Sequence, residues 1–304
     1  MPEGLPSSAA AAAPSPEGEG RERRKFMRVI GIMNRKGGVG KTTTVCNLAY
    51  WLASGHGKRV LVVDLDGQGN ATDCLTKADG KTGAEGEVCP HPALRGHLLP
   101  REKAVELGAA YGMEFPDMPM GELAKKSCVW PQLYVLPGGD GLFDLGDRLE
   151  RVDALERFLH NEENKKQFDF VLIDCPPEFN IAVLNAIEAS DRILIPTTDS
   201  AASRKGAACV IEELQDGDYD VRVTVLPVMW PGVRRRQRRE AKDIAREITA
   251  LGEELGCELA PAAISWTPKA GEADRADKLL GLFSPKCAAS MAYRWLARWL
   301  VEGR

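Results

Sequence analysis

A glycine-rich segment near residue 40 carries the residue types that bind phosphate groups. It reads Lys36-Gly37-Gly38-Val39-Gly40-Lys41-Thr42-Thr43. Because glycine has no Cβ atom, this backbone can curl and point N–H groups at phosphate oxygens, and a helix from Thr42 adds its positive dipole end. We expect Lys41 to contact the β- and γ-phosphates of ATP, and the Thr42 hydroxyl to coordinate Mg²⁺. A glycine-rich loop is often only a turn, but the Gly-Lys-Thr ending favours a phosphate site.

Acidic residues follow two runs of consecutive apolar residues. Asp64 and Asp66 come after residues 60–63, and Asp174 comes after residues 170–173. Continuous apolar runs are typical of parallel strands that are covered on both faces. Phosphoryl transfer depends on cations and on a positioned water, so carboxylates at strand ends are candidates for both tasks. We expect Asp174 to hold Mg²⁺ through a water molecule.

Short β-branched runs alternate with helical stretches from Arg28 onward. The expected strands are 28–33, 59–64, 168–174, 192–196, 221–228 and 259–264, and the expected helices are 42–54, 233–255 and 288–301. This alternation predicts an α/β fold with a doubly wound, mostly parallel sheet flanked by helices. Residues 1–26 have the composition of a disordered tail. We expect residues 27–304 to form one P-loop domain, with an insertion at about 77–131 where the periodicity is lost.

The bulk composition limits the class of protein. The chain has 304 residues, a net charge of −4 and eight cysteines, none of them in a C-x-x-C pair. The charge disfavours a protein that coats nucleic acid with its whole surface, although a local basic patch would be hidden in the sum. No run approaches about 18 apolar residues, and a reducing compartment explains the cysteines most simply. We therefore expect a cytoplasmic protein.

The glycine-rich segment departs from the ordinary G-x-x-x-x-G-K-[ST] pattern, because Arg35 replaces a glycine and Lys36 follows it. In this the sequence resembles the deviant Walker A family of partition and positioning ATPases, the ParA/MinD group, whose pattern K-G-G-x-G-K-[ST] is matched in full. Residues 60–72 resemble a second motif of that family, and residues 173–177 match a third, I-D-C-P-P. The resemblance spans about residues 27–301 apart from the insertion, and it favours the partition ATPases.

The resemblance implies a role for each matching residue. Asp66 would orient or deprotonate the attacking water, Asp64 would lie beside the metal ligands, and Pro176 would border the nucleotide. Lys36 resembles the signature lysine that crosses a dimer interface onto the partner's nucleotide, so it would act in catalysis together with Lys41 and Asp66. The alternative for Lys36 is a solvated loop lysine.

Two departures from the family pattern concern the same site. Gly67 stands where the family has a proline, which loosens the turn after Asp66. Ser265 stands where the family usually has a proline beside the adenine. Neither change removes a phosphate or metal ligand, so we expect altered base affinity or turnover rather than loss of the site.

At the level of function, the resemblance implies a ParA-like ATPase in chromosome or plasmid partition. ATP would join two copies into a sandwich dimer that binds DNA of the nucleoid nonspecifically. A centromere-binding ParB-like partner would stimulate hydrolysis and release, and turnover without it would be slow, because no arginine finger lies near the motifs.

Two alternative functions remain open. The first is a MinD-like membrane-associated spatial regulator, which would use the amphipathic stretch 291–301. That spacing is more typical of a helix packed on the sheet, so a membrane partner is disfavoured. The second is an iron–sulfur reductase of the nitrogenase iron-protein type, for which Cys175 gives no independent support.

An arginine run is the candidate contact with DNA. It comprises Arg234, Arg235, Arg236, Arg238 and Arg239. Arginines in the first turn of a helix oppose its dipole, so helix stability does not explain them, whereas phosphate binding would. The alternative is a solvated charged face.

Overall fold

The structure is a computed structural model that describes residues 27–76, 120–138, 152–230 and 238–303. The side chains of residues 121–122 and 238–245 are outside this description. The tail predicted for residues 1–26 and most of the predicted insertion also lie outside the described residues.

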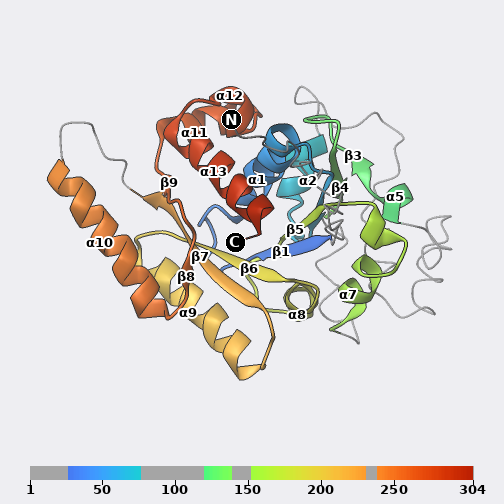
Figure 1. The fold of residues 1–304 in the computed structure, drawn as a ribbon, viewed down its shortest axis with the longest axis horizontal. Coiled ribbons are helices and arrows are strands. Elements are labelled where there is room, and N and C mark those ends of the chain that lie inside the picture. Colours follow the sequence, from blue (N-terminus) through green and yellow to red (C-terminus); the bar gives the residue numbers. More distant parts are fainter. Residues whose placement is uncertain (1–26, 77–119, 139–151, 231–237, 304) are drawn as a thin grey trace, which may run out of the picture.

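A mainly parallel sheet forms the centre of the molecule (Figure 1). Its strands are β1 (Arg28–Ile32), β2 (Val60–Asp64), β3 (Lys125–Lys126), β4 (Leu133–Leu136), β5 (Phe170–Asp174), β6 (Arg192–Thr197), β7 (Arg222–Trp230), β8 (Glu258–Leu259) and β9 (Ile264–Ser265). Their order is β3-β4-β2-β5-β1-β6-β7-β8, and β9 pairs with β7. The β3–β4 pair is antiparallel, and the other pairings in the described residues are parallel. Because β1 lies between β5 and β6, the chain winds outward in both directions, which confirms the predicted fold class.

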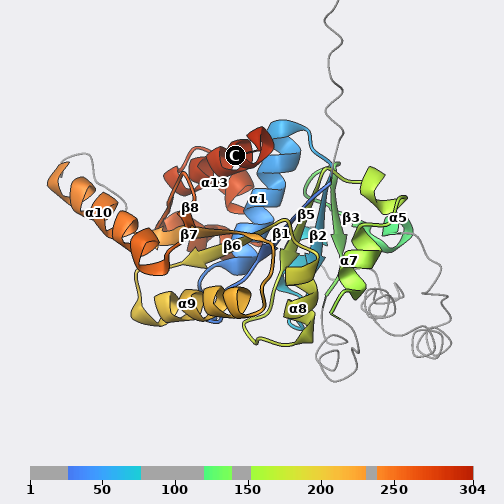
Figure 2. The ribbon, with the colours of Figure 1, turned by 60° about the horizontal axis from the view of Figure 1, so that its bottom comes forward.

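Helices cover both faces of the sheet, and Figure 2 shows α1 and α13 on one side and α8 and α9 on the other. The first face carries α1 (Lys41–His56), α2 (Asn70–Thr76), α11 (Pro268–Arg275), α12 (Leu280–Phe283) and α13 (Ala288–Glu302). The second carries α5 (Met120–Leu123), α7 (Ala154–Leu159), α8 (Ile181–Glu188), α9 (Ala201–Asp216) and α10 (Arg238–Leu255). Successive strand residues point to opposite faces, so Val171 of β5 belongs to one hydrophobic core and Leu172 to the other.

The strand predicted over 259–264 is wrong, because two short strands occupy this stretch. β8 pairs with the middle of β7 and β9 pairs with its end. Residues 260–263 separate them and include Pro261. Proline has no N–H to donate to a neighbouring strand, so it interrupts the ladder at this point.

Two other predicted boundaries can be compared with the structure only in part, because residues beside them lie outside the described ranges. The helix predicted from residue 233 begins at Arg238, and residues 231–237 lie outside the description. The last part of the predicted insertion is built into the fold, because β3 extends the sheet along β4. Met120 of α5 is fully buried in the same core as α7 and α8.

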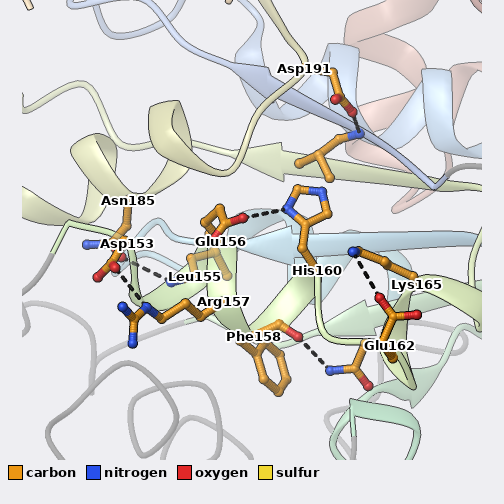
Figure 3. A network of polar contacts seen from close by, with 12 residues as sticks. Asp153, Leu155, Glu156, Arg157, Phe158, His160, Glu162, Lys165, Asn185 and Asp191 are labelled. Atoms are coloured by element: carbon orange, nitrogen blue, oxygen red, sulfur yellow. Dashed lines mark hydrogen bonds and ion pairs between the residues drawn. The ribbon is translucent and has the colours of Figure 1, made fainter. Parts of the chain in front are cut away.

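Polar contacts join α7 to α8 on the second face of the sheet (Figure 3). The Asn185 side chain of α8 accepts a hydrogen bond from the backbone N–H of Leu155 at the start of α7, at 3.1 Å. The Arg157–Asp153 ion pair, 2.7 Å long, lies along the exposed side of α7. Asp191 binds the backbone N–H of Val29 at 2.7 Å, which fixes the beginning of β1.

The C-terminal helix α13 packs against α1 and also against β9, which agrees with its predicted packing on the sheet. It buries Tyr293, Leu296, Ala297, Trp299 and Leu300. In the part of the chain that is described, no helix combines the length and apolarity needed to cross a membrane.

Candidate active site

The sheet register brings the predicted site residues to one edge. Asp174, the last residue of β5, lies beside Ile32 of β1 and beside Asp64 of β2. The glycine-rich loop follows β1 directly, so it begins next to both carboxylates. In a doubly wound fold, ligands bind outside the carboxyl ends of the strands at such a position.

The glycine-rich loop adopts a conformation that requires glycine at two positions. Gly38 has a φ of 73° and Gly40 a φ of 80°, both in the left-handed region that other residues rarely enter. Val39 between them is buried and anchors the loop, whereas Gly37 and Gly38 are exposed. Gly40 is the N-cap of α1, and its carbonyl accepts the Thr44 N–H at 2.9 Å. The loop is thus a preformed concave backbone at a helix N-terminus, which suits a phosphate group.

Asn34 fixes the beginning of this loop. Its side-chain N–H₂ donates to the Pro196 carbonyl at 2.9 Å and to the Ser203 carbonyl at 3.3 Å, and its oxygen accepts the Lys36 N–H at 2.9 Å. Gly206 of α9 packs so closely here that an added Cβ would collide with the Asn34 side-chain oxygen. The loop is therefore held by β6 and α9 as well as by its own helix.

Lys41, the first residue of α1, is close enough to Asp174 and Asp66 for both carboxylates to act on its ammonium group. The side chain is 7% exposed and donates to the Asn34 carbonyl at 3.3 Å. Burial lowers the pKa of Lys41, and the charge of Asp174 opposes that shift. A buried cation with a single weak hydrogen bond is well placed to bind an incoming phosphate oxygen.

Asp174 is a buried carboxylate whose two oxygens have no hydrogen-bond partner among the described residues. Burial, reinforced by the charge of Asp64, raises the pKa of Asp174 to about 8. The Thr42 hydroxyl and the Lys41 ammonium oppose the shift, which places both groups beside this carboxylate. An unpaired carboxylate next to a threonine hydroxyl is a fitting donor set for Mg²⁺, which prefers oxygen ligands.

Asp64 is buried as well, but it is fully engaged in hydrogen bonds. It accepts the Thr72 hydroxyl at 2.6 Å, the Thr72 N–H at 2.8 Å and the Asp66 N–H at 3.1 Å. Burial raises the pKa of Asp64 to about 6, and these bonds oppose the rise. The Thr72 hydroxyl in turn accepts the Gly138 N–H at 2.9 Å. Asp64 therefore acts as the anchor of the turn that carries Asp66.

Asp66 is half-buried in that turn. Its carboxylate accepts the Gln68 N–H at 2.9 Å, and its carbonyl accepts the Gly69 N–H at 3.0 Å. Its charge acts on both Lys41 and Asp174. The turn closes without the proline that Gly67 replaces, because these two hydrogen bonds hold it.

The remaining predicted residues lie at the margins of this cluster. The Lys36 side chain is exposed beside Arg35, which pairs with Glu213 of α9 at 3.4 Å. Pro176 is buried two residues after Asp174. In the arginine run, Arg234, Arg235 and Arg236 and the side chains of Arg238 and Arg239 lie outside the described residues, so the predicted DNA contact stays a prediction.

Two cavities flank Thr43 at the start of α1. The smaller one, about 390 Å³, is bordered by Gly40, Met229, Ser265, Trp266 and Tyr293, among others. The larger one, about 590 Å³, lies between α1, α2 and α11. The smaller cavity is mostly apolar and adjoins the phosphate loop, so it suits a planar base.

Several residues of the site were not found from the sequence. Asn34 and Thr72 hold the loop and the Asp66 turn, yet their roles depend on contacts with distant segments. Met229 has a φ of 55°, at an irregularity where β7 shifts its register against β9. The sequence offered two signals for these roles. Asn34 lies close to the glycines of the loop, and Thr72 belongs to the second motif.

Comparisons with known proteins agree with this geometry. A family model described as AAA domain matches residues 27–221. The chromosome partitioning protein ParA of Caulobacter vibrioides is 29% identical over 282 residues, which cover 91% of this chain and 94% of that protein. The sporulation initiation inhibitor protein Soj of Bacillus subtilis is 37% identical over 169 residues, covering 56% of this chain and 57% of Soj.

A solved structure with the same fold contains a nucleotide. Cobyrinic acid a,c-diamide synthase from Mycobacterium smegmatis, with a bound ATP analogue and magnesium, has a TM-score of 0.64 at 24% identity. The alignment covers 91% of this chain and 97% of that one. At this level of identity, the likeness concerns the fold.

Proposed function

The chain belongs to the AAA domain family of P-loop ATPases, and we propose that its ATP hydrolysis with Mg²⁺ drives DNA partition, as the name of the Caulobacter relative indicates. One observation carries the proposal for the nucleotide. A glycine loop of left-handed residues stands above a buried lysine and a buried carboxylate that lacks any partner in the described residues. A bound phosphate would accept hydrogen bonds from the loop and from the lysine, and a bound cation would neutralise the carboxylate.

Each residue of the cluster has a task in phosphoryl transfer. The loop amides and Lys41 would bind the phosphates, and Thr42 and Asp174 would hold Mg²⁺, the latter through a water molecule. The metal ion, when bound, neutralises charge on the transferring phosphate. Asp66, held in place by the Asp64 anchor, would orient the attacking water.

Lys36 supports a proposal about assembly. Its side chain projects from the loop into solvent, while its backbone N–H is fixed by Asn34. Because the backbone is fixed and the ammonium group is exposed, Lys36 is suited to contact a nucleotide bound by a second copy of the chain. ATP would then join two copies into a sandwich dimer, with Lys36 acting in trans.

The name of one relative supports a role in chromosome partition. The named function of the Caulobacter protein is chromosome partitioning. We therefore propose that the ATP dimer binds DNA nonspecifically through the arginine run at residues 234–239. A ParB-like centromere-binding partner would then stimulate hydrolysis and release.

The nucleotide site is tested by calorimetry with Mg²⁺ and ATP. Wild-type protein should bind ATP more tightly when Mg²⁺ is present, and Asp174→Asn should lose most of that difference while keeping its fold. Asp216→Asn, at the exposed end of α9, is the matched control and should behave as wild type. Equal affinity with and without Mg²⁺ in the wild-type protein would contradict the proposed metal site.

The dimer is tested by the size of the protein in solution with a non-hydrolysable ATP analogue. Wild-type protein and Lys286→Ala, which changes an exposed lysine after α12, should dimerise with the analogue. Lys36→Ala should remain monomeric and should not bind DNA, while still binding nucleotide. A Lys36→Ala variant that dimerises normally would show that the lysine acts only within its own chain.

The membrane alternative predicts a different partner in the same experiments. α13, the helix that it would use, buries seven residues against the rest of the fold. Co-sedimentation with anionic vesicles in place of DNA would favour the MinD-like function. A coloured protein with bound iron and sulfide would favour the reductase.

A further inference from the structure

Two cysteines from neighbouring helices line the larger cavity beside the phosphate loop. Cys46 lies one turn after Thr42 in α1, and Cys74 lies in α2, which packs against α1. Cys46 is 1% exposed, whereas Cys74 is exposed. The pair therefore combines a buried residue with an exposed one.

Each thiol affects the pKa of the other. The nearby Cys46 thiol is the largest cause of the lowered pKa of Cys74. The nearby Cys74 thiol, together with burial, raises the pKa of Cys46 well above its ordinary value. A thiol with a lowered pKa is more often a thiolate, which is the form that attacks disulfides. Nucleotide binding and hydrolysis as described above use neither cysteine.

We propose that Cys46 and Cys74 form a reversible redox site, in which a small disulfide such as glutathione disulfide oxidises the pair to a bridge within one chain. The Cys74 thiolate attacks one sulfur of the oxidant, forms a mixed disulfide and releases one glutathione. Cys46 then attacks the Cys74 sulfur and releases the second glutathione. One S–S bond forms in the protein, one is reduced in the oxidant, and both protons end on the released glutathione thiols.

The bridge would connect the two helices that follow the phosphate loop and the Asp66 turn. α2 begins at Asn70, directly after Gly69, whose N–H binds the Asp66 carbonyl. A disulfide bond is about 2.05 Å long, so its formation draws Cys74 and α2 toward α1. We expect ATP turnover to fall about tenfold or more on oxidation, because a displacement of positioning groups by about 1 Å can cost up to about a hundredfold.

The experiment uses the full chain, reduced and then equilibrated with glutathione disulfide. Peptide mapping without reductant should show Cys46 joined to Cys74, and titration of the denatured protein should show two fewer free thiols. Dithiothreitol should restore both thiols and turnover. Cys74→Ser should keep its basal turnover in the reduced state and should neither form the bridge nor lose activity with the oxidant.

A neighbouring cysteine provides the matched control. Cys128 is exposed, and its thiol donates to the carbonyl of Leu75, the residue after Cys74, at 3.5 Å. Cys128→Ser should form the Cys46–Cys74 bridge as the wild-type protein does. A bridge between Cys74 and Cys128, a mixed disulfide that persists at Cys74, or an unchanged turnover after bridging would each overturn the proposal. Cys46→Ala, which places a small apolar side chain at the buried position, should likewise neither form the bridge nor lose turnover with the oxidant.

Discussion

Asp174 and Asp64 are buried neighbours at the ends of adjacent strands, and their surroundings differ. Asp64 accepts three hydrogen bonds, and Asp174 accepts none from the described residues. Burying an ionised carboxylate without partners is unfavourable, so the pKa of Asp174 rises further than that of Asp64, to about 8 against about 6. The unpaired carboxylate is thus the group that a cation would stabilise most.

This difference predicts how stability depends on pH when no metal is present. The folded-state pKa of Asp174 is raised from 3.8 to about 8, so the stability that its protonated form contributes is lost as the pH rises through that range. Asp174→Asn should not show this loss. We expect the variant to exceed the wild-type free energy of unfolding by at least ~1 kcal/mol above the folded-state pKa, because a difference of one pKa unit corresponds to about 1.4 kcal/mol.

Urea unfolding at a series of pH values without Mg²⁺ measures this effect. The advantage of Asp174→Asn should grow as the pH rises and level off above about pH 8. Asp216→Asn should follow the wild-type curve. Parallel curves for wild type and Asp174→Asn would mean that Asp174 is not protonated in the folded protein.

Part of the site could be predicted from the sequence, because some residue types at some positions indicate only one function. Glycines before Lys41 and Thr42 indicate a phosphate loop, and a carboxylate ending an apolar run indicates a strand end. The supports could not be foreseen in the same way. Asn34 acts through Pro196 and Ser203, and Thr72 acts through Asp64, so only tertiary contacts reveal them.

At the scale of elements, α9 determines the position of the phosphate loop. Gly206 packs against Asn34 and against the backbone of Lys36, while Glu213 pairs with Arg35. The helix approaches the loop this closely because Gly206 has no side chain. A change in the packing of α9 would therefore reach the loop directly.

Gly206→Ala tests this contact. The added Cβ would collide with the Asn34 side-chain oxygen and would lie 3.0 Å from the Lys36 nitrogen, so the helix or the loop must move. We expect a loss of about 1–3 kcal/mol in the free energy of unfolding, as for other overpacked sites, together with weaker ATP binding. Thermal unfolding and calorimetry measure the two effects.

Gly271→Ala in α11 is the control for stability. The nearest atom to its added Cβ is on the flexible side chain of Arg275, at 3.7 Å. Alanine also suits a helix better than glycine, by up to about 1 kcal/mol, so this variant should be as stable as wild type or more stable. If both variants lost the same stability, close packing of α9 on the loop would not explain the result.

The prediction of secondary structure failed where a short segment forms two separate strands, each of which pairs with β7. Residues 259–264 were predicted as one strand, but Pro261 divides this stretch, and the two short strands on either side meet β7 at different places. The long buried strands were predictable because a short continuous apolar run is typical of a strand covered on both faces of a sheet. Pairing partners of two-residue strands depend on the rest of the sheet, which a local pattern does not contain.

At the scale of the whole molecule, the charge sets how DNA can be bound. The net charge is −4, so attraction to DNA cannot come from the average surface. The proposed contact depends on the arginine run and on two copies acting together. Binding of this kind should be nonspecific in sequence and strongly dependent on salt, because each neutralised phosphate releases counterions.

Titration of DNA at several salt concentrations, with a non-hydrolysable ATP analogue, tests this. The logarithm of the affinity should fall linearly with the logarithm of the salt concentration for wild type. Replacing Arg234, Arg235, Arg238 and Arg239 by alanine should weaken binding and reduce the slope by about 0.9 for each phosphate that the variant no longer neutralises. An unchanged slope would place the DNA surface elsewhere.

The two ends of the described chain, near residues 27 and 303, meet at the beginning of β1. Arg28, which begins β1, donates a hydrogen bond to the Leu300 carbonyl near the end of α13, and Gly303 lies against the same guanidinium. The phosphate loop follows the other end of β1. A fluorescent reporter joined after residue 303 would thus be attached at the end of β1 that is farther from the phosphate loop.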